Sequence, residues 1–124
     1  MSMYPATTSF VNILVFVKPD ETAPGGYKVI TSPAAPLITE VDTVINYQIF
    51  DSDGYNIVFT GMTVSPEINN QLSEESVSVS GKLLTFSDAN TEKVDLNITL
   101  QFQDKDNPKL VFSHDPQIIN HPPT

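Results

Sequence analysis

The segment VDLNITLQFQ, residues 94–103, decides the fold class of this chain of 124 residues. Apolar and polar residues alternate along its whole length, so an extended chain has one apolar face and one polar face. This period of two is typical of a strand with one buried side, whereas an amphipathic helix needs a period of 3.6. The segment therefore predicts a long β-strand. Its apolar positions are Val94, Leu96, Ile98, Leu100 and Phe102.

Further strands are predicted on both sides of this segment, because β-branched and aromatic residues recur in short runs between turn residues. The run VNILVFVK at residues 11–18 is apolar on both faces apart from Asn12 and Lys18. That pattern suits a central strand covered on both sides, or one deep in a sandwich. The other predicted strands are residues 27–31, 43–50, 56–64, 76–80, 82–87 and 109–113.

We therefore expect an all-β fold, a single antiparallel β-sandwich of the Ig-like or Greek-key type with about eight strands. The length suits one domain over residues 1–124, with extended N- and C-terminal tails. Gly81 is expected to close a tight hairpin within SVSVSGKLLTF. At most one short helix is expected, at residues 66–75, where Ser65 can cap it and Pro66 suits its first position.

The charge balance excludes several classes of partner. Fifteen acids oppose six basic residues, all of them lysines, and the net charge is −9. An acidic chain without arginine is repelled by nucleic acids and by anionic membranes, so cations, neutral glycans and proteins remain as partners.

The absence of cysteine excludes disulfides, zinc ribbons and thiol nucleophiles, and favours a cytoplasmic location. The apolar run near the N-terminus lacks a preceding lysine and a cleavage site, so we expect neither a signal peptide nor a transmembrane segment.

The stretch FDSDGYNIVF, residues 50–59, uses the residues of calcium loops and of ordinary turns. If Gly54 is aligned with the glycine of the EF-hand pattern, the first ligand position falls on Ile49 and the twelfth on Thr60. Neither residue fits an EF-hand. As a hairpin the stretch works well, because Asp51 can accept backbone N–H groups and Gly54 can take the left-handed conformation.

A calcium site remains an alternative if the strands alternate in direction, because several acidic loops would then lie at one end of the sandwich. The opposite end would collect even more acids, so neither end is singled out. Acidic residues gather in the loops because the strands are apolar. The candidate calcium ligands are Asp20, Asp51, Asp53, Asp104 and Asp106.

Catalytic chemistry finds little support in the sequence. The two histidines, His114 and His121, both lie in the C-terminal segment, and the chain has neither a G-x-S-x-G motif nor a glycine-rich phosphate loop. A carboxylate pair for glycoside hydrolysis stays open, but nothing marks one. We expect no enzyme, no catalytic residue and no cofactor. For glycan stacking the chain lacks tryptophan, and Tyr4, Tyr27 and Tyr55 are the aromatic residues best placed to be exposed.

The C-terminal stretch VFSHDPQIINHPP, residues 111–123, is the most distinctive part of the chain. Asp115 and Pro116 start a turn, and Ile118 and Ile119 offer apolar anchors, so we expect this tail to dock against the sheet and cover an edge. Its pattern D-P-x-I-x-N-x-P, with the N-terminal VNILVFVKPDE, resembles the DP-EP family of small uncharacterised bacterial proteins. The resemblance implies a bacterial origin and an all-β sandwich, and it brings no functional residues.

The sequence thus favours a non-enzymatic protein-interaction or structural module, with self-association into a homo-oligomer through exposed strand edges as one form. The alternative is a cation-assisted or carbohydrate-binding module that uses the acidic loops.

Overall fold

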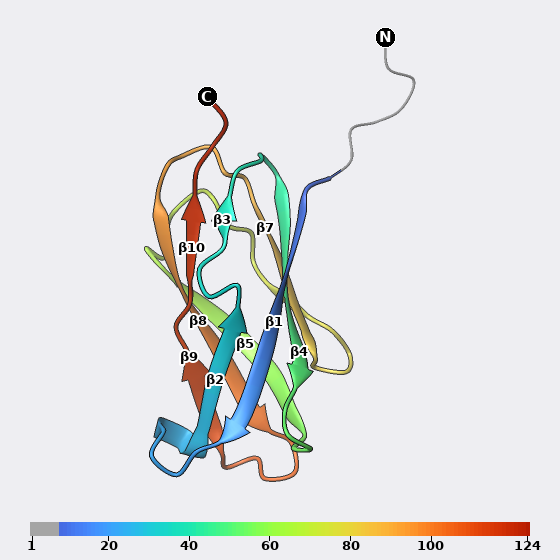
Figure 1. The fold of residues 1–124 in the computed structure, drawn as a ribbon. Helices are drawn as coiled ribbons and strands as arrows, with labels where there is room; N and C mark the ends of the chain where they lie inside the picture. The colour runs from blue at the N-terminus through green and yellow to red at the C-terminus, as the bar shows by residue number, and fades with distance from the viewer. Residues whose placement is uncertain (1–7) are drawn as a thin grey trace.

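Two β-sheets stack face to face in the computed structural model, which describes residues 8–124 (Figure 1). The first sheet has the strand order β2-β1-β4-β7-β6, and the second has the order β3-β10-β8-β5, with β9 also paired to β8. The strands of the first sheet are β1 (Phe10–Pro19), β2 (Tyr27–Ser32), β4 (Thr43–Asp51), β6 (Ser76–Val77) and β7 (Leu83–Asp88). Those of the second are β3 (Leu37–Ile38), β5 (Ile57–Ser65), β8 (Asp95–Asp104), β9 (Val111–His114) and β10 (Gln117–Asn120).

The predicted all-β sandwich is confirmed, but two details of the prediction are wrong. The described residues form ten strands rather than about eight, and the sheets are mixed rather than purely antiparallel. β1 pairs in parallel with β4, and β3 pairs in parallel with β10. The β1–β4 pair is parallel because the chain passes through β2 and β3 before it returns beside β1, and such a crossover is what parallel neighbours require.

The predicted long strand is β8, and its alternation matches its burial. Leu96, Ile98, Leu100 and Phe102 are buried between the sheets, while the intervening side chains point to the solvent side or remain partly exposed. Phe102 lies at the centre of an aromatic stack, with its ring centroid 5.1 Å from Phe59 and 5.1 Å from Phe112. The long strand of the sequence therefore forms the middle of the second sheet and of the core.

The C-terminal segment docks as predicted, and it forms more than a tail. β9 and β10 follow one another along the same side of β8, with Asp115 and Pro116 between them. At this break Asp115 Oδ1 accepts the Thr99 hydroxyl at 2.8 Å, and the Pro116 carbonyl accepts the Ile98 N–H at 2.9 Å. β10 then lies between β8 and β3, so it is an interior strand of its sheet.

The turn predictions are confirmed. Asp51 Oδ1 accepts the Asp53 N–H at 2.9 Å, and Gly54 has a φ of 81°. Gly81, with a φ of 77°, lies in the connection from β6 to β7. Each glycine takes the left-handed backbone that favours this residue type.

The predicted helical turn at residues 66–75 is wrong. Asn69 Oδ1 accepts the N–H groups of Gln71 and Leu72, at 2.8 and 2.9 Å, and Asn70 has a left-handed φ of 56°. A side chain thus satisfies the backbone donors that a helix would use, so the segment stays irregular. Helical structure among the described residues is limited to the 3-10 turn η1 (Pro24–Gly26), and residues 8–124 contain no helix of the length and apolarity needed to cross a membrane.

Candidate functional site

The five predicted calcium ligands lie in three loops. Asp51 and Asp53 are in the connection from β4 to β5, Asp20 follows β1, and Asp104 and Asp106 follow or end β8. Figure 1 shows these three loops at the same end of the sandwich. Because the three loops share one end, this is the end of the molecule at which a shared cation site could form.

Three of these carboxylates accept hydrogen bonds from other groups of the protein, namely Asp20, Asp51 and Asp104. Asp20 Oδ1 accepts the hydroxyl of Thr22 at 2.6 Å and its N–H at 2.9 Å, and these two bonds hold the pKa of Asp20 below its usual value. Asp104 is buried and accepts the Tyr27 hydroxyl at 2.8 Å and the Asp106 N–H at 3.0 Å. Among residues 8–124, no three histidine, aspartate or glutamate side chains gather as a metal site needs. A calcium site at this end of the molecule stays a prediction.

The tyrosines considered for glycan stacking differ in exposure. Tyr27 was expected to be exposed, which is wrong: its ring is buried, stacked on Phe112 at a centroid distance of 4.7 Å. Tyr55 is exposed beside it, and Tyr4 lies outside the described residues.

The two histidines lie on different elements. His114 lies on β9, where desolvation lowers its pKa, whereas His121 follows β10 and is exposed.

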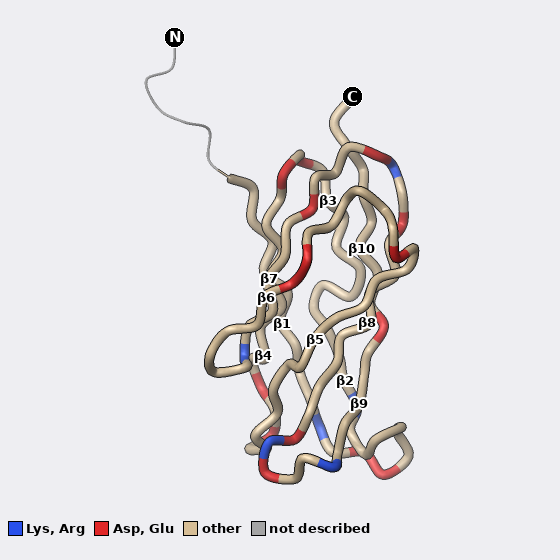
Figure 2. Tube along the Cα trace, turned by 180° about the vertical axis from the view of Figure 1, so that it is seen from behind, with Lys and Arg blue, Asp and Glu red and all other residues tan. Residues whose placement is uncertain are grey.

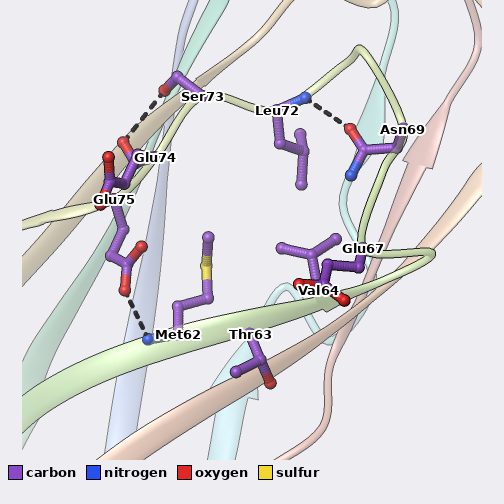
Figure 3. Close-up of a pocket in the computed structure, with 9 residues that line it drawn as sticks. All are labelled: Met62, Thr63, Val64, Glu67, Asn69, Leu72, Ser73, Glu74 and Glu75. Atoms are coloured by element: carbon purple, nitrogen blue, oxygen red, sulfur yellow. Dashed lines mark hydrogen bonds between the residues drawn. The ribbon is translucent and has the colours of Figure 1, made fainter.

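A groove of about 550 Å³ lies between β5 and the segment that leads to β6 (Figure 3). Met62, Val64 and Leu72 provide apolar side chains in it, and three glutamates also line it. Glu75 Oε2 accepts the Met62 N–H at 2.8 Å. Since β5 is the edge strand of its sheet, this bond occupies a backbone donor that would otherwise be open to another strand. The Glu75 side chain thus covers one backbone donor of the β5 edge, and self-association through strand edges stays a prediction. The three glutamates are Glu67, Glu74 and Glu75.

The outer face of the first sheet is unusually apolar for a surface. We define this outer face by the outward residues of β1, β2, β4 and β7. The rings of Phe16 and Phe50 meet edge to face, with their centroids 5.7 Å apart. Phe50 is 62% exposed and Ile30 is 49% exposed, while Leu14 and Phe16 are half-buried. The strand register places Ile30 opposite Phe16, so these side chains are neighbours on one surface.

Between these apolar residues runs a hydrogen-bonded row of uncharged polar side chains. Asn12 Nδ2 donates to Gln48 Oε1 at 3.1 Å, and Asn46 Nδ2 donates to Asn12 Oδ1 at 2.8 Å. The Thr85 hydroxyl donates to Asn46 Oδ1 at 2.6 Å, which extends the row across β1, β4 and β7. Asn46 is buried although it points outward. These hydrogen bonds therefore fix the polar side chains of the outer face without any partner.

The outer face also carries little of the charge that dominates the chain. Its outward positions hold Lys18 and Lys28, which are register partners at one end, and one acid, Asp51. Asp51 lies opposite Phe16 in the register of β1 and β4, and its Oδ1 accepts the Asp53 N–H. Figure 2 shows the acidic residues mostly at the two ends of the sandwich. The second sheet differs, because its outward row of Asn97, Thr99 and Gln101 on β8 is polar.

β1 explains why sequence reasoning missed this outer face. Its two apolar faces predicted a strand covered on both sides. The strand is central in its sheet, and its inward residues Ile13, Val15 and Val17 are buried as expected. Leu14 and Phe16 on its other side are half-buried, and no third layer of the described chain covers them.

These features define a small all-β sandwich protein that leaves one largely apolar sheet face open. The chain belongs to the DP-EP family, whose model matches residues 11–122, which span nearly all of β1 and every later strand. The match confirms the resemblance drawn from the motif at residues 115–122. A comparison with curated proteins found no match.

Proposed function

We propose that the protein is a non-enzymatic interaction module that self-associates through the outer face of its first sheet. The observation that carries this proposal is β1, a strand with two apolar sides of which the chain covers one. A second copy supplies the missing layer when the same outer face of each copy packs against the other. Such an isologous contact is the commonest arrangement of homo-oligomers.

The distribution of charge favours self-association through this outer face rather than through any other surface of the protein. With a net charge of −9, two copies repel one another wherever their acidic ends approach. The outer face reduces that repulsion, because its outward residues are neutral apart from Lys18, Lys28 and Asp51, whose charges sum to +1. The ordered polar row from Asn12 to Thr85 lowers the entropy that association would cost, since its side chains are already fixed.

The expected affinity is modest. Complete burial of one large apolar side chain contributes about 1.5–3 kcal/mol, and Phe50 and Ile30 have the most exposure to lose. Leu14 and Phe16 contribute less, because they are already half-buried. Association itself costs on the order of 4–15 kcal/mol. The balance predicts a weak dimer that forms only at high protein concentration and dissociates on dilution.

The test is the mass of the protein in solution, measured by light scattering and sedimentation over a wide range of concentrations. The wild type should approach twice the monomer mass, and Phe50→Glu should remain monomeric because it replaces an exposed ring by a second acid on the outer face. The matched control is Val79→Glu, which adds the same charge at a fully exposed position in the connection from β6 to β7. A wild type that stays monomeric, or a Phe50→Glu variant that dimerises equally well, would refute the proposal.

A further inference from the structure

A buried cluster of polar side chains lies at the end of the sandwich away from the predicted calcium loops. Asp88 ends β7, Asn90 follows it in the connection to β8, and Asn120 ends β10. Figure 1 shows the ends of β7 and β10 at this end of the molecule. Asp88 and Asn90 are 0% exposed, and Asn120 is 1% exposed. We call these three residues the buried amide–carboxylate cluster.

Every side-chain donor of the cluster is engaged. Asn120 Nδ2 donates to Asp88 Oδ1 at 3.0 Å and to Gln71 Oε1 at 3.1 Å. Asn90 Nδ2 donates to the carbonyls of Ile38 and Glu40, at 3.0 and 3.1 Å. The Asn90 N–H also donates to Asp88 Oδ1 at 2.9 Å. The positions of the two amide nitrogens are therefore fixed, and so are the directions of their amide oxygens.

Three oxygens of the cluster remain without a donor among the described residues: Asp88 Oδ2, Asn90 Oδ1 and Asn120 Oδ1. A buried acceptor without a partner costs about 1–3 kcal/mol, and a charged one costs more. The two partners of the Asp88 carboxylate are neutral N–H groups, so they do not balance its charge. One oxygen of this carboxylate and two amide oxygens thus lack donors, and a positively charged ligand would satisfy them.

We propose that Asp88, Asn90 and Asn120 bind a hard cation, Ca²⁺ or Na⁺, through these three oxygens. Carboxylate and amide oxygens are the ligands that hard cations prefer. Asn90 and Asn120 both bond to Asp88 Oδ1, so the three residues are direct neighbours, and one cation bound between them would satisfy the three acceptors and balance the carboxylate. A single proton on Asp88 Oδ2 would serve one amide oxygen and leave the other unpartnered, and a water has two donors for three acceptors. A Ca²⁺ ion takes about six to eight oxygens, so waters or main-chain carbonyls complete its shell.

The cation would join parts of the chain that are far apart in sequence. The ligands come from the end of β7, from the following loop and from β10, while Asn90 also holds the segment after β3 through the Glu40 carbonyl. Asn120 is the asparagine of the D-P-x-I-x-N-x-P motif. Sequence reasoning missed the site because it counted acids, and two of its three ligands are amides.

The experiment measures melting temperature at matched ionic strength with calcium, sodium or choline chloride, after treatment with a chelator. One carboxylate predicts weak calcium binding, with a Kd of about 10⁻⁴–10⁻³ M. At ten times that concentration the melting temperature should rise by roughly 4–7 °C relative to choline. The shift should vanish in Asp88→Asn and persist in the double variant Asp51→Asn/Asp53→Asn. A shift with sodium alone would assign the site to Na⁺, and one with calcium would assign it to Ca²⁺.

Equilibrium dialysis of the wild type with calcium or sodium gives a readout that does not depend on whether Asp88→Asn folds, and one ion per chain is expected. The absence of both bound ions and thermal shifts would overturn the proposal. So would a shift lost in Asp51→Asn/Asp53→Asn and kept in Asp88→Asn, because that result places the ion at the other end. Burial raises the pKa of Asp88, so a proton is the competing occupant. Stabilisation by acid without any effect of cations would overturn the proposal in favour of that proton.

Discussion

Two buried tyrosine hydroxyls should respond with opposite signs to the same substitution. The Tyr27 hydroxyl donates to Asp104 Oδ2 at 2.8 Å, and Asp104 is itself 5% exposed. The Tyr47 hydroxyl, on β4 of the same sheet as Tyr27, is buried and has no hydrogen-bond partner among the described residues. Replacement by phenylalanine removes one oxygen in each case, so any difference reports the partner. We expect Tyr27→Phe to destabilise the fold and Tyr47→Phe to stabilise it.

The magnitudes follow from the partners. A hydrogen bond to a charged group contributes about 1.5–3 kcal/mol, and without Tyr27 the buried Asp104 carboxylate keeps only the Asp106 N–H among its described partners. Tyr27→Phe should therefore lower the free energy of unfolding by about 2 kcal/mol. An unpaired buried hydroxyl costs about 1–3 kcal/mol, so Tyr47→Phe should raise that free energy by about 1 kcal/mol. Each kcal/mol corresponds to a change of about 4 °C in melting temperature for a domain of this size.

The pH dependence gives a second readout. Desolvation, reinforced by the bond to Asp104, raises the pKa of Tyr27 from 10.0 to about 12. As the pH rises, the Tyr27 hydroxyl therefore loses its proton at a lower pH in the unfolded chain than in the folded one. The contribution of Tyr27 is fully present below pH 10.0 and is lost as the pH rises through about 12. The difference in stability between the wild type and Tyr27→Phe should narrow over this window.

Urea denaturation of the purified variants measures both effects, since it gives the free energy of unfolding at each pH. Tyr55→Phe is the control, because Tyr55 is 45% exposed and its ring packs edge to face on Tyr27 at 5.7 Å. We expect that variant to differ from the wild type by less than about 0.5 kcal/mol. If Tyr27→Phe and Tyr47→Phe shift the free energy of unfolding in the same direction, the reasoning from hydroxyl partners is refuted.

Two further predictions concern a close contact and a titration. Gly54 and Gly81 both have positive φ, but a Cβ at Gly81 would lie 2.6 Å from Val58 Cβ, whereas nothing lies within 4 Å at Gly54. Chemical denaturation should show that Gly81→Ala costs at least about 2 kcal/mol more than Gly54→Ala, and equal costs would contradict this. Desolvation lowers the pKa of His114 below 6.5, so its contribution is present above pH 6.5 and is lost as the pH falls. In thermal melts, His114→Gln should reduce the fall in melting temperature as the pH drops below 6.5. The same fall in the variant and the wild type would contradict this role of His114.

The strands were predictable where burial is decided locally. β8 alternates because one of its sides faces the core, and that period is visible in the sequence itself. The parallel pairing of β1 with β4 was not predictable, because it depends on contacts between distant segments. The segment at residues 66–75 misled us because Pro66 favours a helix start, whereas the Asn69 side chain bonds two later N–H groups and stops one.

The candidate sites were less predictable than the fold. An apolar residue such as Leu14 has the same sequence pattern whether a second layer of the same chain or another molecule covers it. The missing information is the number of layers, which is a property of the whole fold. In the same way, Asn90 and Asn120 have no signal as ligands until burial leaves their oxygens without donors.

The place of β10 also sets the order in which the protein can be assembled on the ribosome. In the second sheet β3 pairs with β10, although most of the described strands lie between them in the sequence. A growing chain therefore has to hold β3 without its sheet partner until residues 117–120 have been synthesised and released from the exit tunnel. Among the described strands, the pairing of β3 with β10 is therefore the last that a growing chain can complete, and it brings in Asn120, which ends β10.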